Sequence, residues 1–133
     1  MLKKKVILDT NFLLIPGQFK VDIFTEIERV MNEPYNLCII DKTINELKGI
    51  EIYGKTKDRN AVKLAIALIQ NLIKQKSLKT INSYSRKSVD DIIVKKSDKN
   101  VYVATQDKEL KKRVKEHQGR IITLKQKKYL IRE

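Results

Sequence analysis

Short runs of consecutive apolar residues alternate along this chain with longer segments in which apolar residues recur every three or four positions. Runs of the first kind predict strands buried on both faces of a sheet, and segments of the second kind predict amphipathic helices. The predicted strands are residues 2–8, 37–40, 77–81, 101–104 and 120–124.

The helical pattern is clearest in the segments between these strands. A helix is predicted over residues 21–32, and the longest one over residues 56–75. Asp41 and Ser88 are typical helix N-caps, so we expect helices after Asp41 and from Val89 onward. The remaining expectations are a helix after Asp107, a short helical turn at 12–15, a loop at Pro16 and Gly17, and a basic tail at 125–133.

Strands that alternate with helices are typical of a parallel sheet covered on both faces. The length of 133 residues is that of one ordinary domain. We therefore predict a single domain, residues 1–133, with three α/β/α layers and a central parallel sheet of about four or five strands.

Acidic residues follow or neighbour several of the predicted strand ends. Asp9 ends the first strand, Asp107 follows the fourth, Glu46 lies in the helix after the second, and Asp90 and Asp91 open another helix. Ligands of open α/β sheets bind beyond the carboxyl ends of the strands. Taken alone, Asp9 fits a turn or a helix cap equally well. Several carboxylates at one edge, however, repel one another unless a cation lies between them, which favours a site for a hard cation such as Mg²⁺ or Mn²⁺.

The charge of the chain adds a second indication. The formal net charge is +13, and residues 108–133 carry ten Lys or Arg against three Glu. A solvated Lys-rich surface would explain this excess, but so would an anionic partner such as RNA. The cations expected to hold an RNA backbone are Lys108, Lys111, Lys112, Arg113 and Lys115.

The single cysteine, Cys38, lies in an apolar run, which favours a buried, reduced thiol and a cytoplasmic protein. The apolar run after Lys3, Lys4 and Lys5 ends at Asp9, too early for a signal peptide. No segment predicts a membrane span.

Four segments together resemble the PIN-domain ribonucleases: residues 6–12, 44–47, 89–93 and 103–113. The resemblance covers nearly the whole chain. It is greatest to the nucleases of the small-subunit processome, which process rRNA, and to their archaeal relatives. VapC-type toxins share the fold and the acids.

The resemblance implies roles for individual residues. Asp9, Glu46, Asp90 and Asp107 correspond to the metal-binding and catalytic acids of the family. Alignment on the Ile pair that follows favours Asp90 over Asp91 as the ligand, although Asp91 stays in the candidate metal set. Thr10, Asn11 and Thr105 match small polar residues that orient ligands or the attacking water.

We therefore expect a Mg²⁺- or Mn²⁺-dependent endoribonuclease that leaves 5′-phosphate and 3′-hydroxyl ends. The resemblance implies an rRNA precursor as substrate, a homodimer, and a ribosome-assembly or antitoxin-like protein partner. The alternatives are a VapC-type toxin and a non-catalytic RNA-binding or assembly module on the same fold. An aspartyl-phosphate mechanism is disfavoured, because Asp9-Thr10-Asn11 lacks the second Asp that haloacid-dehalogenase-like phosphatases carry.

Overall fold

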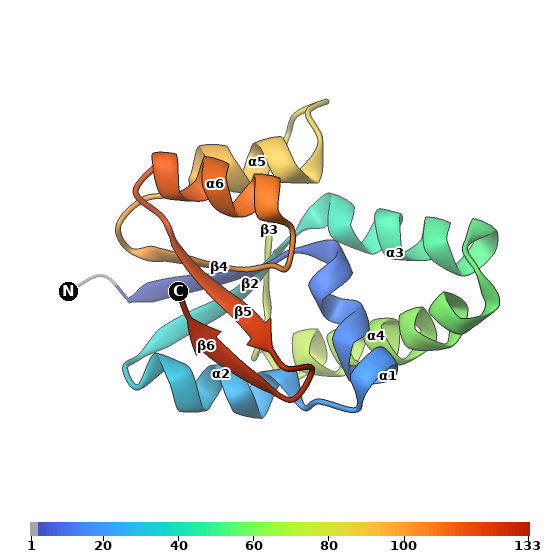
Figure 1. Ribbon diagram of the computed structural model, residues 1–133. Helices are drawn as coiled ribbons and strands as arrows, with labels where there is room; N and C mark the ends of the chain where they lie inside the picture. The colour runs from blue at the N-terminus through green and yellow to red at the C-terminus, as the bar shows by residue number, and fades with distance from the viewer. Residues whose placement is uncertain (1–2) are drawn as a thin grey trace.

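The computed structural model describes residues 3–133, in which six strands form one sheet in the order β3-β2-β1-β4-β5-β6 (Figure 1). β1 to β5 are all parallel to one another, and β6 is antiparallel to β5. The strands are β1 (Lys4–Leu8), β2 (Tyr35–Ile40), β3 (Lys79–Ile81), β4 (Val101–Ala104), β5 (Arg120–Lys125) and β6 (Tyr129–Arg132).

Helices fill the connections between the strands. They are the 3₁₀ helix η1 (Thr10–Leu14) and the α-helices α1 (Ile15–Phe19), α2 (Ile23–Met31), α3 (Asp41–Tyr53), α4 (Thr56–Lys74), α5 (Val89–Lys96) and α6 (Lys108–Glu116). Within residues 3–133, none of these helices combines the length and apolar character that crossing a bilayer requires.

The predicted α/β class and all five predicted strands are confirmed. Leu2, the first residue of the predicted first strand, lies outside the described residues. The expected loop at Pro16 and Gly17 is wrong, because both residues lie in α1. Proline is compatible with the first turn of a helix, where its missing N–H has no helical partner to lose.

The expected tail at 125–133 is also wrong, because it forms a hairpin with β5. Leu130 of β6 is fully buried and pairs with Leu124. The turn places Gln126 and Lys127 at positive φ without any glycine, so it lacks the usual sequence signal of a hairpin. The backbone N–H of Leu130 donates to Glu26 and its carbonyl accepts from Arg29, so α2 covers this strand edge.

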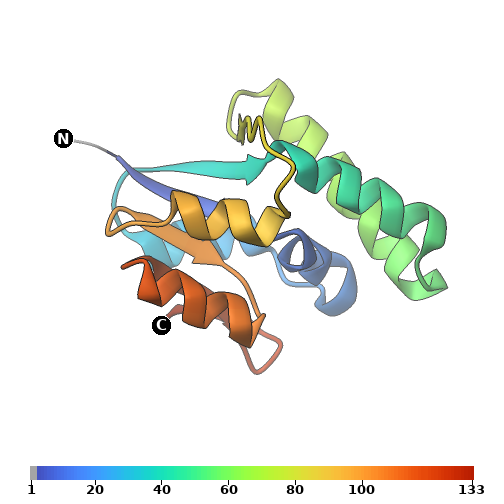
Figure 2. The same cartoon turned by 90° about the horizontal axis from the view of Figure 1, so that it is seen from above.

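The helices cover the two faces of the sheet unequally (Figures 1 and 2). Val6 and Leu8 of β1 pack with η1, α1, α2 and α4, whereas Ile7 packs with α5 and α6. This alternation along one strand follows from the two-residue period of side chains in a sheet. β1 thus contributes to both cores.

The connections change face at the centre of the sheet. Those from β1 to β2 and from β2 to β3 run through α1–α4, whereas those from β3 to β4 and from β4 to β5 run through α5 and α6. The neighbours β1 and β4 therefore flank a topological switch point, the place where doubly wound sheets bind ligands. Asp9 follows one of these strands and Thr105 the other.

The helices α1 and α4 approach each other at Gly17. A Cβ at position 17 would lie 2.5 Å from Ala61 Cα, and this backbone atom cannot move away as a flexible side chain could.

We expect Gly17→Ala to lower the free energy of unfolding by about 1–3 kcal/mol, the usual cost of overpacking. The matched control is Gly49→Ala in α3, where a Cβ would meet nothing within 4 Å. There we expect a gain of up to about 1 kcal/mol from helix propensity. Urea denaturation of the two variants measures the difference, and equal effects would contradict the close approach.

Candidate active site

Asp9 lies at the switch point, directly after β1. Its backbone N–H donates to the carbonyl of Ala104 at 3.0 Å, so the ladder between β1 and β4 extends to this residue. Only 6% of Asp9 is exposed. The hydroxyl of Thr105, itself fully buried, donates to Asp9 Oδ2 at 2.9 Å. The strand pairing and this hydroxyl together fix the orientation of the carboxylate.

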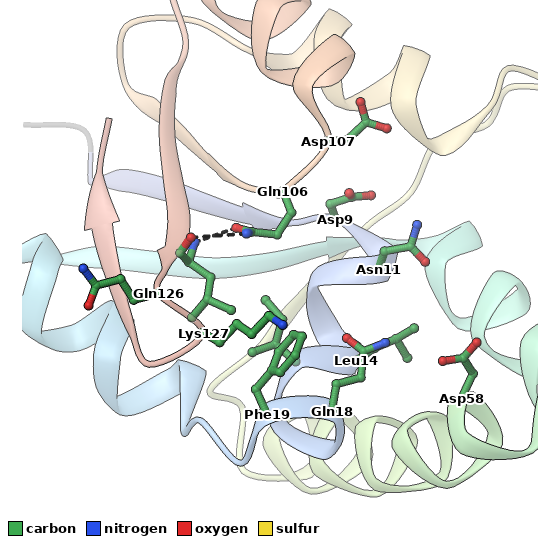
Figure 3. A pocket seen from close by; sticks show the side chains of 12 residues that line it. Asp9, Asn11, Leu14, Gln18, Phe19, Asp58, Gln106, Asp107, Gln126 and Lys127 are labelled. Atoms are coloured by element: carbon green, nitrogen blue, oxygen red, sulfur yellow. Dashed lines mark hydrogen bonds between the residues drawn. The ribbon is translucent and has the colours of Figure 1, made fainter.

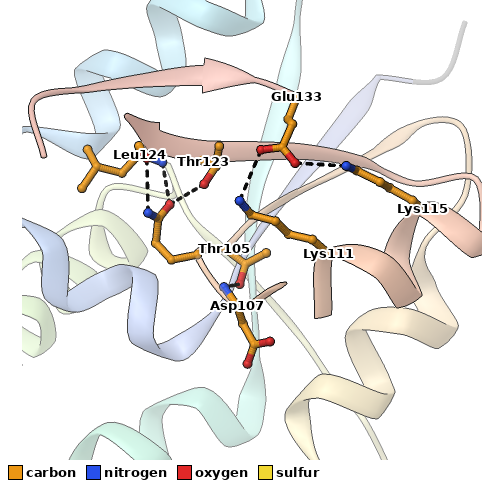
Figure 4. A network of polar contacts seen from close by, with 8 residues as sticks. Thr105, Asp107, Lys111, Lys115, Thr123, Leu124 and Glu133 are labelled. Atoms are coloured by element: carbon orange, nitrogen blue, oxygen red, sulfur yellow. Dashed lines mark hydrogen bonds and ion pairs between the residues drawn. The ribbon is translucent and has the colours of Figure 1, made fainter. Parts of the chain in front are cut away.

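Asp107 is tied to the same hydroxyl. Its backbone N–H donates to Thr105 Oγ1 at 3.1 Å (Figure 4), and its side chain caps α6 by accepting from the N–H of Leu110 at 3.0 Å. Figure 3 shows Asp107, Asp9 and Asn11 around one cavity. Thr105 therefore holds two acidic segments that are far apart in the sequence.

Glu46 reaches the site from α3. The hydroxyl of buried Thr10 donates to Glu46 Oε1 and also lies 3.4 Å from Thr43 Oγ1. Asn11, the next residue of η1, is exposed. Thr10 thus links the end of β1 to α3.

The two adjacent aspartates of α5 lie in different surroundings. Asp90 lines a cavity with Asp9 and Glu46. Asp91 forms an ion pair with Arg113 of α6 at 2.7 Å, and its backbone N–H donates to the capping Ser88. The hydrogen bond that the Arg113 guanidinium donates to the carboxylate of Asp91 is the largest cause of the lowered pKa of Asp91. A metal at the edge of the sheet would thus have Asp90 nearby, whereas the carboxylate of Asp91 is engaged with Arg113.

Two cavities meet at Asp9 and Asn11. The first has a volume of about 820 Å³ and extends toward α1 and the β5–β6 turn. The second, of about 580 Å³, extends toward α3 and the start of α5. Besides Asp9 and Asn11, the residues that line one or the other include Phe19, Asp58, Gln106, Asp107, Lys127, Glu46, Tyr53, Ser88 and Asp90.

The carboxylates interact electrostatically. Burial raises the pKa of Asp9 to about 6, and the charges of Asp90 and Asp107 add to the rise, against hydrogen bonds from Thr105 and Thr10. Burial raises the pKa of Asp90 as well, and the charges of Asp107 and Glu46 raise it further. The four acids therefore form one mutually repelling group.

A hard cation fits the chemistry of this group, whose donors are all carboxylate oxygens. Within residues 3–133, no group of three His, Cys, Asp or Glu side chains is arranged so that it could hold a metal ion without some movement. The pKa values of Asp9 and Asp90 are raised mainly by burial and further by neighbouring carboxylates, and a bound cation would offset both effects.

The predicted RNA-binding cations of α6 differ in their surroundings. Lys111 and Lys115 form ion pairs with Glu133 at 3.3 and 3.0 Å (Figure 4), and Arg113 pairs with Asp91. Among the described residues, Lys108 and Lys112 have no ion pair. The first three cations are thus partly neutralised within the protein.

The structure adds three residues to the site for which the sequence patterns predict no role. Gln106 fixes the end of β4 to β5, accepting from Leu124 N–H and from the hydroxyl of Thr123 at 2.6 Å. Phe19 and Lys127 line the larger cavity, with Lys127 Nζ 5.5 Å from the centre of the Phe19 ring (Figure 3). They come from a helix end and a turn, where no periodicity marks a residue.

The raised pKa of Asp9 predicts how metal-free stability changes with pH. The ordinary pKa of Asp is 3.8, and the pKa of Asp9 in the folded protein is about 6. Below pH 3.8 the carboxyl group is protonated in both states, whereas above pH 6 the folded protein bears the full cost of the buried charge. This shift corresponds to about 3 kcal/mol. We expect the free energy of unfolding of the wild type in EDTA, relative to Asp9→Asn, to fall by about that amount between these pH values. Urea denaturation at both ends of the range measures it, and a difference that does not change with pH would contradict the assignment.

The chain is similar to known proteins in both sequence and structure. Residues 6–127 match the family described as PIN like domain. Ribonuclease VapC4 of Methanocaldococcus jannaschii is 34% identical over 131 residues, which cover 94% of this chain and 93% of that protein. The PIN domain endonuclease Utp24 has a similar structure, with a TM-score of 0.74 and 26% identity over 97% of this chain and 90% of the other. A domain of unknown function from M. jannaschii shares the fold, with a TM-score of 0.60, 19% identity, and coverage of 92% of this chain and 91% of the other.

Proposed function

The chain belongs to the PIN-like domain family, and we propose that it is a divalent-metal-dependent endoribonuclease. The observation that carries the proposal is the group of four acids at the switch point, in which the pKa of buried Asp9 rises to about 6. The net charge of +13 supports a polyanionic substrate. A pure RNA-binding module gains nothing from carboxylates placed where phosphates would lie, so the acids favour the enzyme.

The proposed roles follow the positions of the side chains. Asp9, Glu46, Asp90 and Asp107 would hold Mg²⁺ or Mn²⁺, which when bound supplies Lewis acidity and lowers the pKa of water. Thr105 keeps Asp9 in one orientation, and Thr10 does the same for Glu46. The exposed amide of Asn11, between the two cavities, can donate to a phosphate oxygen. Asp91 acts indirectly, by holding α6 through Arg113.

Two substrate classes are compatible with these roles. The likeness to Utp24 supports our leading proposal, processing of an rRNA precursor, with a ribosome-assembly partner. The 34% identity to VapC4 supports a toxin ribonuclease with an antitoxin-like partner equally well. Incubating the protein with an rRNA precursor, with tRNA and with mRNA compares the two proposals, since preferential cleavage of the precursor favours processing.

The direct test of the activity is cleavage of a long RNA in the presence of Mn²⁺. We expect internal cuts whose products carry 5′-phosphate and 3′-hydroxyl ends, as ligation of adaptors specific for these ends would reveal. Products with 2′,3′-cyclic phosphate ends would contradict the proposed attack by water. Complete absence of cleavage across the three RNA classes would favour the non-catalytic RNA-binding module.

We further propose that residues 1–133 act as one domain in the cytoplasm. The thiol of Cys38 is buried, and its burial raises its pKa, which makes it a poor nucleophile for disulfide exchange.

A further inference from the structure

We propose that Tyr53 is a base-stacking residue, and that one base of an RNA strand lies on its ring where the strand crosses the acids from one cavity to the other. This inference rests on the proposed function, since it takes RNA as the ligand. It adds a residue that recognises the RNA, and it assigns a role to an aromatic side chain that folding leaves largely in solvent.

Tyr53 is the last residue of α3, and 87% of it is exposed. It nevertheless lines the smaller cavity together with Asp9, Glu46 and Asp90. An exposed aromatic ring beside the acids contributes little to the core but offers a flat apolar face to a ligand. Stacking on such rings is the usual way in which proteins hold unpaired bases.

The larger cavity has an aromatic ring of its own. Phe19 is 37% exposed, and the ammonium group of Lys127 lies over its ring (Figure 3). Since the cavities meet at Asp9 and Asn11, the rings of Phe19 and Tyr53 lie on either side of the junction along the path. A strand whose phosphate reaches Asn11 would thus have one neighbouring nucleotide in each cavity.

The charges along the path suit a nucleic-acid backbone. Lys127 lies in the larger cavity. At the other end, a third cavity of about 450 Å³ shares Glu46, Ser88 and Val89 with the second and is also lined by Lys42, Arg86 and Lys87. Along the three cavities, the acids therefore lie between Lys127 on one side and the cations of the third cavity on the other. The cations attract flanking phosphates, while the acids lie where cleavage is proposed.

The path distinguishes an unpaired strand from a duplex. In A-form RNA the bases are stacked on one another within the helix, so their faces cannot reach Tyr53. An unpaired strand can turn its bases outward onto protein rings. Stacking on Tyr53 therefore requires an unpaired nucleotide, in a single strand or in a loop.

The test is a binding measurement that does not depend on cleavage. A 5′-fluorescein-labelled 12-nucleotide RNA, alone or annealed to its complement, is titrated with protein in EDTA at low salt, and anisotropy gives Kd. We expect the single strand to bind at least about tenfold more tightly than the duplex. Tyr53→Ala should weaken single-strand binding by about 5- to 150-fold, the usual effect of losing one stacked base. Tyr53→Phe should retain wild-type binding.

The matched control is Tyr84→Ala, because Tyr84 is 91% exposed but lines none of these three cavities. Equal effects of Tyr53→Ala and Tyr84→Ala, or equal binding of single strand and duplex, would overturn the inference. Binding of neither RNA by the wild type would overturn it too. Cleavage with Mn²⁺ is scored separately, so a protein that binds single strands through Tyr53 but never cuts them would refute the nuclease and not the stacking site.

Discussion

Asp9→Asn is expected to lower kcat/KM for RNA cleavage with Mn²⁺ by about a thousandfold or more. The change keeps the shape of the side chain and its hydrogen bond from Thr105 but removes the charge at the centre of the acidic group. A bound metal ion supplies several kcal/mol of transition-state stabilisation, and each 1.36 kcal/mol is tenfold in rate. Single-turnover cleavage of a labelled RNA measures the loss.

The matched control for this variant is Asp98→Asn, which makes the same chemical change at the turn before β4. Asp98 accepts from the N–H of Asn100 and lines a cavity with Lys5 and Lys96, apart from the four acids. We expect its activity to stay within about twofold of the wild type, because it removes no charge from the group at the switch point. Wild-type rates for Asp9→Asn would refute the acidic-site mechanism.

Chelation of divalent cations by EDTA is expected to abolish cleavage completely. Returning Mn²⁺ at about 100 times its Kd should restore the activity and raise the free energy of unfolding by about 2.7 kcal/mol. The physical reason is that Asp9 and Asp90 repel each other and the other acids until a cation lies between them. Thermal denaturation during a Mn²⁺ titration measures the stabilisation independently of the RNA.

Asp9→Asn protein serves as the control for the titration. It should gain much less stability from Mn²⁺ than the wild type, because both the charge and one proposed ligand are changed. Undiminished cleavage in excess EDTA, or the same stabilisation of wild type and variant, would show that Mn²⁺ does not act at this site.

Much of the fold was predictable because buried strands and helices have regular patterns of apolar residues in the sequence. Ile7 and its neighbours form an uninterrupted apolar run because β1 packs against helices on both faces. The positions of Asp9 and Asp107 followed from the rule that parallel strands end at one edge. The roles proposed for Asp90 and Thr105 rest on the resemblance to a family, since neither residue is distinctive by itself.

The unpredicted features depend on contacts that are distant in sequence. The sequence predicts a tail in place of β6 because residues 125–128 are polar and contain no glycine. The edge of β6 is completed by Glu26 and Arg29 of α2, which are distant in the sequence. The neutralisation of Lys111 and Lys115 by Glu133 likewise depends on the strand that brings Glu133 back to α6. The pattern of residues within a short segment contains no information on contacts with distant segments.

The hydrogen bond between Thr105 and Asp9 spans 96 residues of sequence, and this separation has a consequence for synthesis of the protein. A nascent chain that ends before residue 105 has Asp9 but neither the hydroxyl that orients it nor the strand β4 beside it. Because β1 and β4 are parallel and distant in sequence, their pairing forms slowly compared with local structure. The acidic group is therefore assembled only when most of the chain has left the ribosome. An enzyme that cuts RNA would in this way be unable to act on its own message or ribosome during most of its translation.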